Sequence, residues 1–348
     1  MKPFAEFFEH YIPDRLNVGR FASAYTLPQL DEMVFDTTVS LPVVALGMPA
    51  RKLKDFGELV LPPLYLQAMD QDLREGMINR ILQTFPYYPG TRKRQRCMGN
   101  LKVIEYPSIK FFRSESPDIL GISVDPAIEQ HGPHLPLGTE SFISHAVLTR
   151  LEKTVDSFGV GLPVDYGSLT WSLPHGMSIN MGTEYLSRYV QGFANAMMQW
   201  ARPKGLYVVM THGSKAHRKA VEKGLSKSFC QYWKTRWLLE PLGESMVRED
   251  NHAGGLHTAL MREIQPALVD GNALEGLAER QLSSKEAQTE SHGEFKWIDR
   301  VEESGNNGIF GDIERLDEHD APTLMDKMVG TAAEDVDQLA AEISNVTA

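Results

Sequence analysis

The sequence predicts an α/β fold in which a mostly parallel sheet is covered by helices on both faces. Two observations support this prediction. From about residue 101 onward, short apolar runs alternate with segments that have helical periodicity. In addition, 42% of the 348 residues are hydrophobic, which is enough for a sizeable core. The length fits about two domains, or one large domain with an appendage.

Each element of this fold is predicted from its own pattern. The compact run DILGISVD and the run GLYVVM are typical of buried strands, and the latter is the clearest. Helices are predicted where apolar side chains recur every three or four residues. The predicted elements are, in chain order, a strand at 118–125, a helix at 141–156, a strand at 159–167, a helix at 184–200, a strand at 205–210, a helix at 214–225 and a last helix at 321–344.

Composition excludes several classes of function. The formal net charge of -11 argues against nucleic-acid binding by bulk charge. The two cysteines, Cys97 and Cys230, exclude a disulfide framework and a cysteine-rich zinc module, and they favour a cytoplasmic protein. We found neither a signal-peptide pattern nor an apolar run of the roughly 18 residues that a membrane span needs. P-loop, G-x-S-x-G and G-x-G-x-x-G motifs are also missing.

Two segments differ from the rest of the chain. Residues 1–104 are rich in proline and aromatics, and we expect an N-terminal extension that covers a subunit interface or the mouth of a pocket. The basic run at 92–96 within it is interpreted as a linker or subunit contact rather than an anion site. Residues 281–307 are polar and are expected to form a long loop, either functional or disordered.

Histidines and acids gather where the predicted strands end. Glu129 and His131 come directly after the strand at 118–125, with His134 and Glu140 following in the stiff segment IEQHGPHLPLGTES. His212 follows the strand at 205–210, at the same sheet edge. Converging carboxylates and imidazoles suit Zn, Mn or Fe(II). The alternative is a proline-rich turn with surface side chains.

A third segment, REDNHAGGLHTALM, contains Asp250, His252 and His257 around two glycines. Small residues beside a histidine let a ligand approach the backbone closely. The alternative is a glycine-rich helix entry that Asp250 caps. His217 is interpreted as structural, and His175 is a weaker candidate.

The segment EQHGPHLPLGTE resembles the signature of the creatininase (creatinine amidohydrolase) family. That signature starts with glutamate-glutamine-histidine-glycine, continues with histidine-leucine-proline-leucine and ends in threonine-aspartate. The segments VVMTHGSK, DNHAGGLHTALM, EIQPALVD and GIFGD follow in the family's order. The resemblance covers about residues 105–345, so we expect a family domain at 105–348.

The resemblance implies a three-layer α/β/α sandwich, a homo-oligomer that is often a hexamer, and hydrolysis of C–N bonds in small amides with divalent metal. Zn or Mn is expected, with Fe possible. His252 matches a histidine placed for proton transfer, with Asp250 in front of it. The positions that match metal ligands or a bridging acid are Glu129, His131, Glu140 and His212.

This sequence departs from the family pattern around the second metal. Glu140 replaces an aspartate, Ser214 stands where creatininase has a glutamate ligand, and Gly255 and His257 replace two acids. We therefore expect one tight metal and a second that is weak or absent, with His257 as a substitute ligand or a pocket residue.

The function predicted from these residues is a metal-dependent amidohydrolase acting on a small amide, lactam or cyclic amide, with no nucleic-acid or membrane partner. Creatinine itself is not the expected substrate, because its pocket residues do not match. Two alternatives stay open at this point. One is a metal-dependent enzyme of other chemistry, such as a lyase, an isomerase or a dehalogenating hydrolase. The other is a non-catalytic, metal-stabilised assembly subunit.

Overall fold

The computed structural model describes residues 117–161, 163–169, 172, 178–243, 246–247, 252–275, 277 and 308–347, with 44–46, 59–61, 69–70, 72–73, 76–77 and 80. Asp250, His175, the run at 92–96 and the loop at 281–307 lie outside the described residues. Two short parallel strands, β1 (Val44–Leu46) and β2 (Leu59–Leu61), form a separate pair.

The predicted parallel sheet is confirmed. Its four strands are all parallel and lie in the order β4-β3-β5-β6. They are β3 (Ile119–Ser123), β4 (Phe158–Val160), β5 (Gly205–Met210) and β6 (Trp233–Trp237).

The strand predicted at 159–167 is wrong in its length. The structure has β4 ending at Val160, with only isolated bridges at Val164 and Gly167. Pro163 lies between the end of β4 at Val160 and the bridge at Val164, and it has no N–H to donate to a strand ladder.

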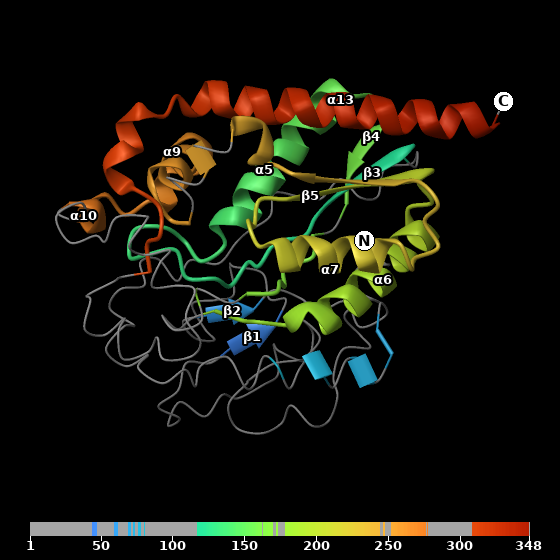
Figure 1. Ribbon diagram of the computed structural model, residues 1–348, viewed down its shortest axis with the longest axis horizontal. Helices are drawn as coiled ribbons and strands as arrows, with labels where there is room; N and C mark the ends of the chain where they lie inside the picture. Colours follow the sequence, from blue (N-terminus) through green and yellow to red (C-terminus); the bar gives the residue numbers. More distant parts are fainter. Residues whose placement is uncertain are drawn as a thin grey trace, which may run out of the picture.

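Helices cover both faces of the sheet, which gives the three layers that were predicted (Figure 1). Along β5 the side chains alternate between two buried clusters. Tyr207 and Val209 pack on one face, and Leu206, Val208 and Met210 pack on the other. The first face is covered by α5 (Thr139–Thr154), α9 (Gly255–Ile264) and α13 (Ala321–Thr347), and the second by α6 (Gly182–Trp200) and α7 (Lys215–Leu225).

Short elements complete the described fold. They are η6 (Glu240–Leu242), η7 (Pro266–Leu268), α10 (Gly271–Leu274) and η9 (Ile313–Glu318). Among the described residues, no helix is long and apolar enough to span a bilayer.

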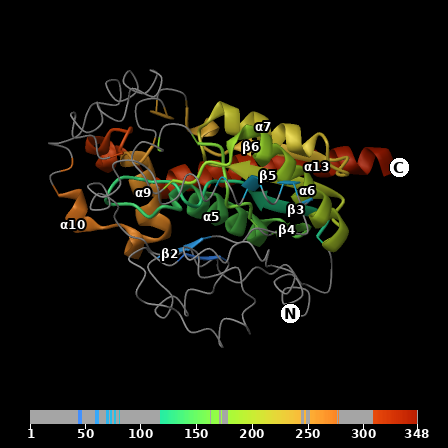
Figure 2. The ribbon, with the colours of Figure 1, turned by 90° about the horizontal axis from the view of Figure 1, so that it is seen from below.

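The order of the strands locates the functional edge of the sheet. The chain leaves β3 through α5 to β4 on one side, and leaves β5 through α7 to β6 on the other. The point between β3 and β5 is therefore the switch point at which parallel sheets bind ligands, outside the carboxyl ends of their strands. Figure 2 shows α9 beside the loop that joins β3 to α5 at this edge.

Part of the predicted N-terminal extension packs on the sheet domain. Met69, Leu73 and Met77 are buried in the same cluster as the inner face of α6. On the rim of this contact, Arg188 of α6 binds Asp70 at 3.0 Å. These residues are therefore part of the core, although the sequence alone assigns them to an appendage.

Candidate metal centre

The loop after β3 is a rigid turn that presents Glu129 and His131 at the sheet edge. The Glu129 N–H donates to the Leu137 carbonyl at 3.2 Å, which closes the loop on itself. Gly132 has φ 67, a left-handed conformation that glycine adopts without strain. Its N–H donates to the side-chain oxygen of Gln130 at 3.0 Å.

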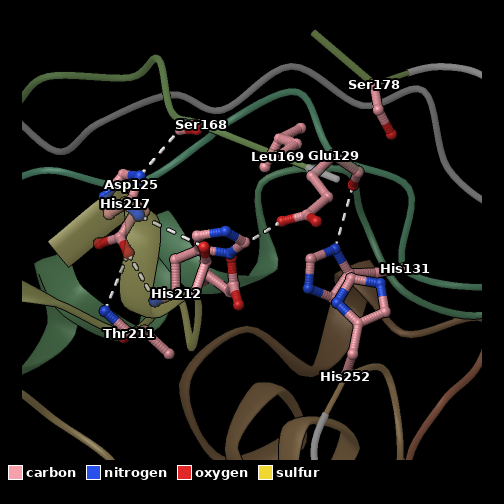
Figure 3. A network of polar contacts seen from close by, with 12 residues as sticks. Asp125, Glu129, His131, Ser168, Leu169, Ser178, Thr211, His212, His217 and His252 are labelled. Carbon is pink, nitrogen blue, oxygen red and sulfur yellow. Dashed lines mark hydrogen bonds and ion pairs between the residues drawn. The ribbon is translucent and has the colours of Figure 1, made fainter. Parts of the chain in front are cut away.

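Two carboxylates from the β3–α5 segment meet one histidine from the end of β5. The Nδ1 atom of His212 lies 2.8 Å from Oε2 of Glu140, in the first turn of α5, and 3.2 Å from Oε2 of Glu129. All three side chains are buried. Figure 3 shows His212 and Glu129 facing each other across this edge. Segments about 70 residues apart in the chain thus form one polar cluster.

A second group of rings extends this cluster. One ligand atom from each of Glu129, His131, Glu140 and His252 lies within 4.8 Å of the others. The rings of His131 and His252 are 4.1 Å apart between centroids. Four donors this close together could hold a metal ion, and they lie at the switch point of the sheet.

Burial keeps the imidazoles of His131 and His257 neutral. It lowers the pKa of His131 well below its usual value, and the positive charge of a protonated His252 would lower it further. It also lowers the pKa of His257 to about 3. A neutral imidazole retains the lone pair that a metal ligand or a hydrogen-bond acceptor needs.

The pKa values of the two carboxylates are shifted in opposite directions. Burial raises the pKa of Glu140 to about 8, and the negative charge of Glu129 adds to that rise. Burial also acts on Glu129, but the adjacent His212 outweighs it and holds the pKa of that carboxyl well below its usual range. For His212 itself, burial is outweighed by Glu140 and Glu129, which raise its pKa. A cation bound here would offset the same negative charge.

The residues present fit a metal ion. The Nε2 atoms of His131, His212 and His257 are buried and have no hydrogen-bond partner among the described residues. Leaving such a group unsatisfied costs about 1–3 kcal/mol. Oxygen and imidazole nitrogen donors together suit Zn, Mn or Fe.

The structure brings most of the predicted site residues together. Glu129, His131, Glu140 and His212 converge as described, and His257 lies beside His131 with ring centroids 5.5 Å apart. His252, predicted for proton transfer, lies within the same cluster, and its Nε2 is 2.7 Å from the Gln130 carbonyl.

Two further histidines support the fold around the centre. His217 uses both ring nitrogens, donating to the Val124 carbonyl at 3.0 Å and accepting from the Ser168 N–H at 3.2 Å. Its side chain thus has no nitrogen left for a metal, which agrees with its structural interpretation. His134 is bonded to Thr258 of α9 at 2.9 Å, and so it fastens α9 to the loop after β3.

Sequence reasoning missed Asp125 and Gln130. One carboxylate oxygen of Asp125 accepts the N–H groups of Thr211 and His212, both at 2.8 Å (Figure 3). The side-chain amide of Gln130 donates to the Gly308 carbonyl at 2.9 Å. The signal for Asp125 was its place at the end of the predicted strand 118–125. Gln130 stands in the segment EQHGPHLPLGTE, but nothing in that segment points to its partner, which is 178 residues away.

A cleft of about 520 Å³ lies between α6 and α7 and contains none of these residues. Its walls include Lys219, Lys223 and Lys227. The metal cluster is therefore separate from this cleft.

Comparisons with known proteins agree with the geometry. A family model described as creatininase, creatinine amidohydrolase, matches residues 126–336. A glutamate-to-glutamine mutant creatininase complexed with creatine has a TM-score of 0.51 at 13% identity, over 63% of this chain and 91% of that chain. A tryptophan-to-phenylalanine mutant creatininase has a TM-score of 0.50 at 14% identity, over 64% and 91%. At these identities the likeness shows the fold. None of the curated proteins compared matches the sequence.

Proposed function

The chain belongs to the creatininase family, and from this premise we propose that it is a metal-dependent hydrolase of a C–N bond in a small amide, lactam or cyclic amide. The observation that carries the proposal is the cluster of Glu129, His131, Glu140 and His252 at the switch point of the sheet, in which the first three are buried and His252 is partly exposed. A structural role alone does not require the buried Nε2 atoms of His131, His212 and His257, which have no hydrogen-bond partner among the described residues.

We assign the metal ligands to the loop after β3, the start of α5 and the end of β5. Zn or Mn is proposed, with Fe as the alternative, in one tight site and a second, weaker one. When bound, such an ion polarises a carbonyl and makes water nucleophilic near neutral pH. The proposed ligands are Glu129, His131, Glu140 and His212.

The protein's own part in the reaction is to hold and move protons. His252 is proposed to deliver a proton to the leaving nitrogen. Its ring contacts His131 at 4.1 Å and lies 5.6 Å from Phe310 between centroids, which restricts its orientation. Asp250, two residues earlier in the chain, is proposed to assist it.

The remaining expectations are proposals on the same basis. Residues 1–104 are proposed to cover a subunit interface or the pocket mouth of a homo-oligomer, for which a hexamer is one form, around the domain at 105–348. The low cysteine count supports a cytoplasmic location. The substrate is a small molecule.

Elemental analysis with an activity assay tests the proposal. The full chain, purified with Zn or Mn, should hold close to stoichiometric metal and hydrolyse at least one member of a panel of small cyclic amides. His131→Ala should lose most of the metal, whereas the control His319→Ala, outside the cluster, should retain it. Hydrolysis by metal-free protein would contradict the proposal.

A further inference from the structure

His257 faces the metal cluster from the first turn of α9. Its side chain is buried, and its ring stacks on that of His131 with an interplanar angle of 29°. The ring of His252 lies on another side, 6.4 Å away between centroids. His257 is therefore in the centre, although its sequence position left two roles open, metal ligand or pocket residue.

A backbone hydrogen bond determines which nitrogen of His257 carries the proton. The N–H of Ala253 donates to Nδ1 of His257 at 3.3 Å. An atom that accepts this bond has a lone pair and no proton. A neutral imidazole holds one proton, so the proton of His257 is on Nε2.

The backbone at Ala253 reinforces this bond. Ala253 has φ 59, a left-handed conformation that costs a non-glycine residue about 1–3 kcal/mol. Residues held in such conformations cluster at functional sites. Here the conformation occurs in the residue between His252 and Gly254, and it accompanies the N–H bond to His257.

The stacked rings of His131 and His257 therefore have opposite tautomers. Nδ1 of His131 donates to the Glu129 carbonyl at 3.0 Å, which leaves a lone pair on its Nε2. In His257 the Nε2 atom is an N–H donor. His131 is thus prepared to bind a metal, whereas His257 is prepared to bind a hydrogen-bond acceptor.

We propose that His257 is a specificity-determining residue: its buried Nε2–H binds an acceptor atom of the substrate, a carbonyl oxygen or an unprotonated ring nitrogen, and it does not bind metal. Nε2 has no partner among the described residues, and a buried donor without a partner is costly. The claim that the bound molecule is an amide rests on the proposed function. The tautomer does not, because it follows from the bond to Ala253.

Nitrogen NMR of the full chain, labelled with ¹⁵N-histidine, tests the tautomer directly. Spectra are taken of the Zn-loaded protein and again after chelation, and His257→Gln identifies the signals of His257. We expect the Nε2–H form in both states. A proton on Nδ1, or a shift of Nε2 that requires a bound metal, would overturn the inference.

Two variants test the role in binding. His257→Gln keeps a side-chain N–H donor, and His257→Leu has none. Both should retain the metal content of the wild type. For the best cyclic amide in the panel, kcat/KM should fall about tenfold to a hundredfold in His257→Leu and by less in His257→Gln. Lost metal, or equal kcat/KM in all three proteins, would overturn the assignment.

These measurements separate the two proposals. A wild-type protein that binds metal and hydrolyses nothing in the panel would contradict the proposed function, while the NMR spectra still decide the state of His257. If His257→Leu does not fold, the metal content of His257→Gln and the spectra of the wild type decide the question.

Discussion

A single carboxylate oxygen of Asp125 accepts the backbone N–H of His212 at 2.8 Å, and it accepts the N–H of Thr211 at the same distance. Asp125 follows β3 and His212 follows β5, so this oxygen joins the carboxyl ends of the two central strands. The bonds orient the peptide from which the His212 ring projects toward Glu140. Asp125 therefore positions His212, a proposed ligand, through its backbone N–H.

Replacing Asp125 should weaken metal binding. Asp125→Leu removes the acceptor of two buried N–H groups, and the affinity for Zn, measured by calorimetry on chelated protein, should fall about 10–100-fold. Asp125→Asn keeps an acceptor oxygen and should retain most of the affinity. Asp335→Asn, which alters a buried carboxylate on α13, is the control for lost stability. Equal affinity in Asp125→Leu and wild type would contradict the positioning role.

His252 should act on protons rather than hold the metal. His252→Ala is expected to retain the metal and to lower kcat by about 10²-fold or more, the usual scale for general acid–base catalysis. Metal content and kcat are measured on the same preparation, with His319→Ala as a control. Because His252 lies among the possible ligands, loss of metal in the variant would make it a ligand and refute the assignment.

The sequence predicted the parts of the centre that follow from strand ends. Glu129 and His212 were placed together because carboxyl ends of parallel strands share one edge, and the structure has them in contact. The strand predicted at 205–210 matches β5, because a short apolar run that contains β-branched residues is typical of a buried strand. The helix predicted at 141–156 begins two residues earlier, at Thr139.

What sequence reasoning could not predict depends on contacts between distant segments. The donor state of His257 follows from the bond that the Ala253 N–H donates to its Nδ1 atom, which no residue pattern specifies. Gly255 was interpreted as room for a ligand. In the structure, a Cβ there would lie 2.6 Å from the backbone of Leu316, so this glycine lets α9 pack against η9.

Asp335 should make the free energy of unfolding depend on pH. It accepts two bonds from the guanidinium of Arg236, at 2.6 and 2.8 Å, and one from the hydroxyl of Tyr207 at 3.0 Å. Burial alone would raise the pKa of Asp335, but its bonds to Arg236 and Lys234 outweigh burial and lower it. The folded-state pKa is thus below the unfolded one of about 3.9.

A group with this shift stabilises the fold above its unfolded pKa, and that contribution is lost as pH falls through the folded pKa. Asp335→Asn should lower the free energy of unfolding by about 2 kcal/mol at pH 7. The difference from wild type should shrink below about pH 4. Urea unfolding measures it, with the exposed Asp326→Asn as a control. A difference that is constant with pH would contradict this account.

Replacement by alanine should change the free energy of unfolding in opposite directions at two glycines. Gly308 has φ 85, and a Cβ there would overlap the side-chain amide of Gln130. Gly308→Ala should therefore cost about 1–3 kcal/mol of unfolding free energy. Gly330 is exposed in α13 with no atom within 4 Å of an added Cβ, so Gly330→Ala should add about 0.5–1 kcal/mol. Urea unfolding of both variants checks this, and stabilisation by Gly308→Ala would refute it.

Deleting residues 1–100 should destabilise the fold as well as change the proposed interface or pocket mouth. The deleted segment contains Met69, Leu73 and Met77, which are buried in the same cluster as α6. Their loss exposes apolar surface on α6, at about 25 cal/mol for each Å². We expect a lower thermal midpoint and a changed oligomeric state by light scattering. Deleting residues 1–40 spares these contacts and should keep the midpoint. The longer deletion removes none of the proposed metal ligands and should still bind Zn. An unchanged midpoint and size would show that the segment contributes neither to the core nor to assembly.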